Sequence, residues 1–237
     1  MSAVGELGEA DRSGGVPAVA GSSPHPALPI ELRLSSVRDI RPLVEMYMEL
    51  SPEARRFYHP FPFDRSHLWV IYGYMVLASR LARATVRMFP HWSVVLIVAV
   101  VPGQPRPIGY GTIRFVGDRG SNLRAKMGFT VAEGYRGRGI GTALLKRMIA
   151  ATLAVGVTRA VGTILRANTA SLTVAKKFGG TYQERPDTPD RFAPGEANVV
   201  AEADLTQYYH LLDERDREAA ARRAARREGR RTGPTAR

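Results

Sequence analysis

The 237-residue sequence contains no cysteine. This absence excludes disulfide bridges, thiol catalysis and any metal site built on thiolate ligands. Long apolar runs are also missing, because residues 68–78 are followed by Arg80 and Arg83, well short of the roughly 20 apolar residues that a membrane-spanning helix needs. The first residues lack the basic start and apolar core of a signal peptide. We therefore expect a cytoplasmic protein that does not insert into a membrane.

Acidic residues are outnumbered, at 22 Asp and Glu against 34 Lys and Arg, and the formal net charge is +12. Nine arginines and four acidic residues lie between Glu214 and Arg237, so nearly half of the excess is in that segment. We expect residues 213–237 to form an arginine-rich tail, helical or disordered, that contacts nucleic acid without sequence specificity or only aids solubility. Residues 1–29, rich in Gly, Ala, Ser and Pro, are expected to be a disordered extension. A single domain would occupy residues 30–212.

Hydrophobic periodicity predicts both strands and helices in that domain. A capping box formed by Ser36 and Asp39 should open the first helix, and the aromatic and proline-rich residues 55–63 should form an ordered loop. Helices are expected from about residue 40, from 64 to 86, up to 155 and over 169–178. Strands are expected over 30–34, 94–101, 108–116, 123–131, 159–165, 181–184 and 198–205. The β-branched run 94–101 should be buried on both faces, and it should begin an antiparallel meander of three strands.

A glycine-rich stretch, VAEGYRGRGIGTALL, joins the third strand of the meander to the next helix over residues 131–145. Glycines at 137, 139 and 141 allow positive φ angles and close approach of a ligand to the backbone. Several N–H groups can then surround one point at the start of a helix, and such a nest binds phosphate groups. Arg136 and Arg138 add positive charge. The spacing matches neither a P-loop nor a Rossmann turn.

The residues Arg136-Gly137-Arg138-Gly139-Ile140-Gly141 resemble the R/Q-x-x-G-x-G/A acyl-CoA motif of the GNAT N-acetyltransferases. A second match follows, in which Leu165 to Asn168 leads to Lys177-Phe178-Gly179 with the family's spacing. The resemblance covers about residues 30–205. It implies an α/β fold with a mixed, mostly antiparallel, splayed sheet flanked by helices in a single domain.

The resemblance also implies acetyl-CoA as cosubstrate and no metal. The pantetheine arm would pair with the backbone beside Val131, and the pyrophosphate would rest on the glycine-rich turn. The expected cofactor-binding residues are Phe129, Thr130, Val131, Arg136, Gly137, Arg138, Gly139, Ile140, Gly141, Thr142, Asn168 and Ser171.

The implied reaction is direct transfer of an acetyl group to a primary amine, which must first lose a proton. By family analogy the Val131 amide would stabilise the developing oxyanion. Two proton carriers of the family are missing, because Ala175 stands where many members have tyrosine and Ala125 stands where histone-type members have glutamate. Glu133 is the remaining candidate base, unless it is a solvated loop carboxylate. Tyr182 is a candidate acid, unless it is a packing residue.

A second hypothesis remains open. The chain could be a regulatory, nucleic-acid-associated module that binds acyl-CoA without turnover. For an enzyme, the residues do not distinguish a protein lysine, a protein N-terminus or an amino sugar as acceptor, and the positive charge disfavours a polyamine. We expect a monomer or a homodimer.

Overall fold

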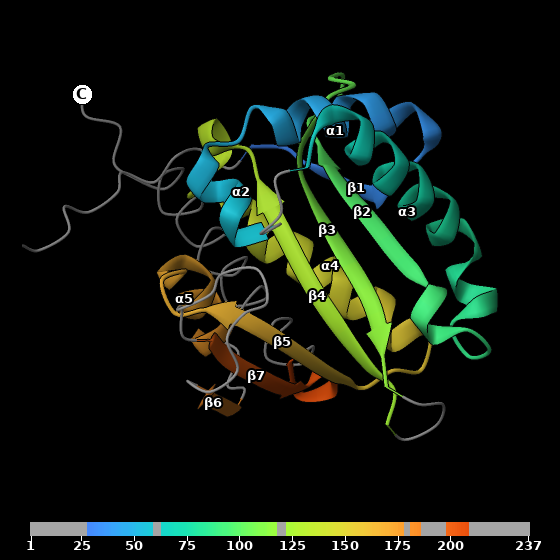
Figure 1. The fold of residues 1–237 in the computed structure, drawn as a ribbon, viewed down its shortest axis with the longest axis vertical. Helices are drawn as coiled ribbons and strands as arrows, with labels where there is room; N and C mark the ends of the chain where they lie inside the picture. Colours follow the sequence, from blue (N-terminus) through green and yellow to red (C-terminus); the bar gives the residue numbers. More distant parts are fainter. Residues whose placement is uncertain (1–27, 59–62, 118–121, 178–180, 186–197, 209–237) are drawn as a thin grey trace, which may run out of the picture.

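The computed structural model describes residues 28–58, 63–117, 122–177, 181–185 and 198–208. These residues contain a seven-stranded sheet in the order β1-β2-β3-β4-β5-β7-β6 (Figure 1). Every neighbouring pair of strands is antiparallel except β4 and β5. The strands are β1 (Glu31–Leu34), β2 (Val94–Val100), β3 (Pro107–Val116), β4 (Arg124–Val131), β5 (Arg159–Leu165), β6 (Thr181–Arg185) and β7 (Asn198–Asp204).

Helices cover both faces of the sheet. In Figure 1, α1 and α3 lie over one face of the meander and α4 lies behind it. The α-helices are α1 (Ile40–Met48), α2 (Pro52–Tyr58), α3 (Arg65–Thr85), α4 (Ile140–Ala154) and α5 (Thr169–Lys177). Three short 3-10 helices are η1 (Val37–Asp39), η2 (Pro90–Trp92) and η3 (Glu133–Tyr135). None of the helices described, including the 21-residue α3, has the length and apolar character needed to cross a membrane.

Strand β2 lies in the centre of the two-sided core, as the β-branched run predicts. All seven of its residues are buried. Leu96 and Val98 join the cluster formed with α1 and α3, whereas Ile97 and Ala99 join the cluster formed with α4. Alternate side chains of a strand point to opposite faces, so one unbroken apolar run supplies both layers of the core.

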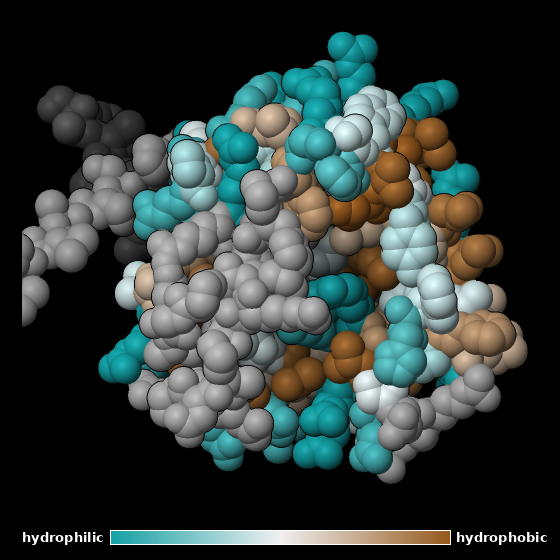
Figure 2. Space-filling model, viewed as in Figure 1, coloured by the Kyte–Doolittle hydropathy of each residue, from teal (hydrophilic) through white to brown (hydrophobic). Residues whose placement is uncertain are grey.

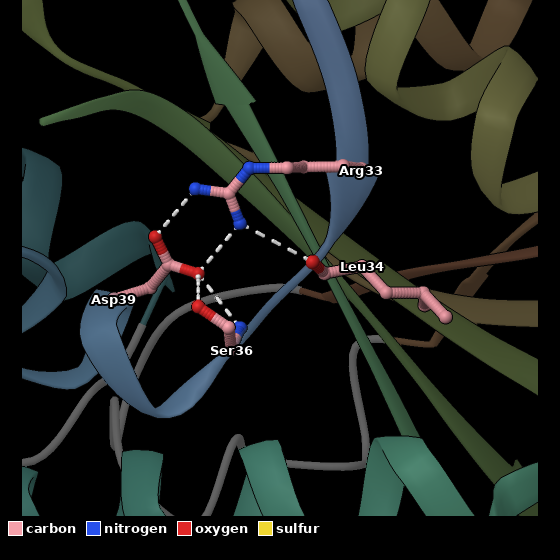
Figure 3. Close-up of polar contacts among 4 residues, drawn as sticks. All are labelled: Arg33, Leu34, Ser36 and Asp39. Atoms are coloured by element: carbon pink, nitrogen blue, oxygen red, sulfur yellow. Dashed lines mark hydrogen bonds and ion pairs between the residues drawn. The ribbon is translucent and has the colours of Figure 1, made fainter. Parts of the chain in front are cut away.

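The corner between β1 and α1 is closed by an ion pair between the half-buried Arg33 and the buried Asp39 (Figure 3). The Arg33 guanidinium donates two hydrogen bonds of 2.7 Å to the Asp39 carboxylate. The backbone N–H and the hydroxyl of Ser36 donate to the same carboxylate at 2.7 and 2.9 Å. This arrangement confirms the predicted capping box and adds Arg33 to it, although the first turn that it opens is the 3-10 helix η1.

The predicted loop at residues 55–63 is wrong in its first part, because α2 runs through Tyr58. Pro52 begins this helix at a position where the missing N–H is not needed. The Ser51 hydroxyl accepts a hydrogen bond from the Ala54 N–H at 3.2 Å, and Glu53 lies in the first turn, so the helix has both a cap and a favourable charge. Residues 59–62 and the predicted tail at 213–237 lie outside the described part of the chain. So does the predicted extension at 1–29 except for its last two residues, of which Leu28 packs against the core.

Candidate functional site

Strands β4 and β5 touch only at their beginnings. Their single recorded parallel pair joins Ala125 to Ala160, and the two strands diverge from that point toward the carboxyl end of β4 (Figure 1). Val131 lies six residues beyond the pair, at the open end. The sheet is therefore splayed beside β4, as the resemblance implies.

The backbone of β4 presents to this opening polar groups that do not pair with β3. The Ala132 N–H donates to the Ile108 carbonyl of β3 at 2.9 Å, and β3 pairs with β4 without a register shift. Because antiparallel ladders alternate, the N–H and C=O groups of Phe129 and Val131 point away from β3, toward β5. Thr130 directs its backbone groups to β3, and its side chain is buried. An extended amide chain could therefore pair with Phe129 and Val131 but not with the backbone of Thr130.

The turn after η3 depends on two glycines with left-handed backbone conformation. Gly137 has a φ of 74° and Gly139 a φ of 80°. Gly139 is also the N-cap of α4. No heavy atom of the described chain lies within 4 Å of the Cβ positions that a side chain would occupy at either residue. Any residue other than glycine would be strained at these two positions, and the space above the backbone of the turn is open.

Amide N–H groups are gathered along this turn. The Arg136 N–H donates to Glu133 and the Ala143 N–H to Gly139, at 3.2 and 3.0 Å. Between these two, the structure records no hydrogen bond from the amides of residues 137–142 to any described residue. Ile140 is buried, so only its backbone faces the turn, whereas Thr142 is exposed. The first N–H groups of α4 are therefore available to an anion.

Gly141 has a different role from the other two glycines. A Cβ at this position would lie 2.8 Å from Cε2 of Phe129, too close for a normal contact. The first turn of α4 therefore packs directly on the ring of a β4 residue. This contact couples the glycine-rich turn to the strand whose free backbone groups face the opening.

The two arginines of the motif also brace the turn. The Arg136 Nε donates to the Val131 carbonyl at 3.3 Å, and its guanidinium lies 3.7 Å from the Glu133 carboxylate. The Arg138 guanidinium carbon lies 5.6 Å from the centre of the Tyr135 ring. Both positive charges therefore lie next to the turn in defined positions, as the motif predicts.

Glu133 is tied to the segment between α1 and α2. Its Oε1 accepts a hydrogen bond from the Ser51 N–H at 3.0 Å. Hydrogen bonding from Ser51, together with the nearby Arg136 charge, holds the pKa of the Glu133 carboxyl below its usual range. A lower pKa makes this carboxylate a weaker base. Ser51 was not predicted from the sequence, because no local pattern signals a contact across 82 positions.

A cavity of about 290 Å³ lies beside this tether. Residues from the end of α1, the turn between β2 and β3, and η3 line it, and the described lining contains no residue of β5 or α5. The cavity is thus separate from the opening between β4 and β5. Among its lining residues are Glu49, Leu50, Arg106, Ile108 and Glu133.

Asn168 and Ser171, the predicted contacts from the second motif, lie at the start of α5. The Asn168 Oδ1 accepts a hydrogen bond from the Ser171 N–H at 3.0 Å, which makes Asn168 a helix cap. Its side-chain NH2 donates to no residue that the structure describes. One side-chain donor thus remains free at the carboxyl end of β5. Phe178 and Gly179 lie outside the described residues.

Tyr182 lies on β6, where its backbone is opposite Ala201. Strand β6 is the last of the sheet, separated from β4 by β7 and β5. The side chain of Tyr182 is outside the described part, so its role as an acid stays a prediction. Within the described ranges, no group of three or more His, Asp or Glu side chains could hold a metal ion.

Comparisons with known proteins agree with this architecture. A family model described as "Acetyltransferase (GNAT) domain" matches residues 30–181. Mycobacterium smegmatis RimJ in complex with CoA-disulfide is similar with a TM-score of 0.63 and 21% identity, over 81% of this chain and 91% of that one.

Two further solved structures show the same fold. Ribosomal-protein-S5-alanine acetyltransferase from Vibrio fischeri has a TM-score of 0.60 and 13% identity, over 74% of this chain and 93% of that one. The Salmonella typhimurium protein yncA, solved with its cofactor acetyl-CoA, has a TM-score of 0.55 and 16% identity, over 74% and 94%. The predicted fold class is therefore confirmed.

Proposed function

The chain belongs to the GNAT acetyltransferase family, and from this premise we propose that it transfers an acetyl group from acetyl-CoA directly to a primary amine. One observation carries the proposal. The free amides of residues 137–142 lie just after the end of β4, and the outward backbone groups of β4 face the β4–β5 opening. An extended amide ligand that carries a diphosphate needs both features next to each other. The residues present therefore fit acetyl-CoA, whose thioester supplies an activated acetyl group.

Different groups of the chain bind different parts of acetyl-CoA. The amides of residues 137–142 hold the pyrophosphate, and Arg136 and Arg138 lower the cost of bringing its negative charge to the surface. The outward N–H and C=O groups of Phe129 pair with the pantetheine amides in the manner of an added strand, which leaves the Val131 N–H for the acyl oxygen. The free NH2 of Asn168 donates to the same arm from the opposite side of the opening.

Charge stabilisation falls to Val131. Its N–H points away from β3 into the opening, and the structure records no hydrogen bond from it to a described residue. A fixed donor of this kind stabilises the negative charge that develops on the acyl oxygen during attack by the amine. Because the amide is part of a paired strand, no reorganisation is needed when that charge appears.

Proton transfer does not depend on Glu133 in this proposal. Its hydrogen bond to Ser51 and its lowered pKa suit a carboxylate that positions a loop better than one that accepts a proton. Solvent is the base for the acceptor amine. A thiol is far more acidic than an alcohol, so the leaving thiolate does not require a dedicated acid.

The alternative is a module that binds acyl-CoA without turnover. Purified protein is incubated with acetyl-CoA and a panel of amines, and free thiol release is measured. The panel contains a peptide beginning with alanine, suggested by the Vibrio fischeri neighbour, together with a lysine peptide, an amino sugar and a polyamine. Release that depends on the acceptor supports the transferase. Tight acetyl-CoA binding with no such release across the panel would support the module.

A further inference from the structure

Helix α3 has a second apolar stripe that faces away from the protein. Its inner stripe, which includes Leu68, Tyr72 and Val76, packs in the core. Large apolar side chains also continue along the outer side and into the turn after the helix, and Figure 2 shows apolar residues gathered along the side of the molecule where Figure 1 draws α3. We call these residues the outer α3 face: Trp69, Val70, Tyr74, Leu77, Leu81, Met88, Phe89 and Trp92.

The spacing of the stripe is that of a helix-packing seam. Val70, Tyr74, Leu77 and Leu81 follow one another at intervals of four, three and four residues. This spacing places them in one line along a helix, as in the apolar positions of paired helices. An outer surface that only met water would have polar residues there.

The outer α3 face is held rigidly. The Tyr74 hydroxyl donates to the Trp92 carbonyl at 2.8 Å, which fixes the turn after α3 against the helix. The Thr85 and Ser93 hydroxyls are also hydrogen-bonded, at 2.8 Å. The exposed aromatic side chains therefore project from a preorganised surface, and their ordering adds little cost to binding.

The size of this face suits a stable interface. Its eight side chains are between 42% and 74% exposed. The four aromatic side chains, at roughly 150–250 Å² each and about half exposed, contribute on the order of 400 Å², and the four aliphatic side chains add to this area. A typical monomer shows a largest apolar patch of about 300–600 Å², whereas a standard interface covers about 800 Å² on each partner.

Gly73 lies next to this stripe in the middle of α3. No described heavy atom lies within 4 Å of the Cβ that another residue would have there. Glycine within a helix costs about 1 kcal/mol relative to alanine, and the described fold has no contact that would require it. A missing side chain on an outer helical surface lets a second helix approach closely. A lipid surface would gain nothing from it.

The two terminal segments 1–27 and 213–237 are poorly suited to cover the face. Residues 1–27 contain no aromatic residue, and no large apolar residue follows Leu212. A second copy, in contrast, presents the same stripe of aromatic and aliphatic side chains. Two-fold symmetry makes one apolar stripe complementary to itself when the helices run antiparallel.

We propose that the outer α3 face is the two-fold interface of a homodimer, in which α3 packs antiparallel against α3 of a second copy. A two-fold axis between Tyr74 and Leu77 packs Tyr74 against the partner's Leu77 and Val70 against the partner's Leu81. Arg80, which is exposed on one flank, then lies near the partner's Trp69, where a cation can stack on the indole ring. Helix α3 covers β2, so the β4–β5 opening stays free in both copies (Figure 1).

The test measures the molar mass of the full chain by sedimentation equilibrium between about 1 and 100 µM, a range that covers weak and moderate interfaces of this area. The wild type should approach twice its 26.0 kDa mass. L77D places two carboxylates at the centre of the interface and should raise the dimer dissociation constant at least ~100-fold. The matched control L77M keeps an apolar side chain of similar volume and should stay dimeric.

Position 77 is exposed, so L77D should keep the circular dichroism spectrum and the acetyl-CoA affinity of the wild type. A wild type that stays at 26.0 kDa at the highest concentration overturns the proposal. If that monomer pellets with phosphatidylglycerol vesicles, the face binds lipid instead. A dimer that L77D leaves unchanged would also overturn the proposal, because its interface would lie elsewhere.

Discussion

The backbone N–H of Ser51 donates a hydrogen bond to Oε1 of Glu133 at 3.0 Å, across 82 positions of sequence. This bond joins the entrance of α2 to the 3-10 turn that leads into the glycine-rich turn. A side chain on one segment thus sets the position of the other. The bond also accounts for the lowered pKa of the Glu133 carboxyl.

Substitution of Glu133 separates a tethering role from a role as base. E133Q keeps an oxygen that can accept from Ser51, so we expect kcat/KM to stay within about 3-fold of the wild type. Removal of a general base would instead cost about 100-fold or more. E133A loses the tether and should lower kcat/KM by about 10-fold through misplacement of the turn. The measurement is the rate of thiol release at saturating acceptor. A large loss of kcat/KM in E133Q would show that Glu133 is the base.

Substitution of Gly139 should damage acetyl-CoA binding directly. G139V forces a β-branched residue into a φ of 80° and places its side chain in the space above the amides of the turn. We expect the dissociation constant for acetyl-CoA to rise at least ~30-fold in calorimetry. The control is G134V, at a glycine that has open space around it and no positive φ, where affinity should change by less than about 3-fold. Normal affinity in G139V would contradict the assigned pyrophosphate site.

The contact between Gly141 and Phe129 predicts a compensating pair of substitutions. G141A places a methyl group 2.8 Å from the Phe129 ring and should lower the free energy of unfolding by about 1–3 kcal/mol. The F129L exchange removes the ring edge, so the double variant should be more stable than the two separate effects predict. Urea denaturation of the four proteins measures this coupling. If the changes in the free energy of unfolding are additive, the loss in G141A does not come from contact with the Phe129 ring.

Asn168 has two roles that one substitution can divide. N168D keeps the oxygen that caps α5 but removes the NH2 group proposed to donate to the pantetheine arm. Thermal stability should therefore stay close to that of the wild type, while acetyl-CoA affinity falls by about 10-fold. N168A should lose both. Unchanged affinity in N168D would reduce Asn168 to a helix cap.

The buried carboxylate of Asp39 should make stability depend on pH. Burial alone would raise its pKa, but the hydrogen bonds from Arg33 and Ser36 outweigh burial and hold the pKa below the ordinary value. Its stabilising contribution is therefore complete above the unfolded pKa of about 3.9 and is lost as the pH falls further. At pH 7, D39N should lower the free energy of unfolding by about 2–3 kcal/mol. That difference should shrink below about pH 4, and a difference independent of pH would contradict this assignment.

Local chemistry in the sequence determined most of the elements. The β-branched run of β2 is buried on both faces because alternate residues must serve both layers. Gly137 and Gly139 adopt the positive φ angles that a turn of this kind requires, and Asp39 forms the predicted capping box. These features depend on residues a few positions apart, so their patterns can be recognised without the rest of the chain.

Tertiary structure alone decided the features that depend on distant residues. Helix α2 is an exception, because Ser51 and Pro52 supply a local cap and first turn, whereas the prolines and aromatic residues that follow suggested a loop. The sequence predicted Glu133 as the candidate base or as a solvated loop carboxylate, and only the fold brings Ser51 to it. The apolar residues of α3 point in two directions, and only the packing of Tyr72 against β3 shows that Leu77 is on the uncovered side. Sequence patterns report which residues prefer burial, but the three-dimensional packing decides which of them are actually covered.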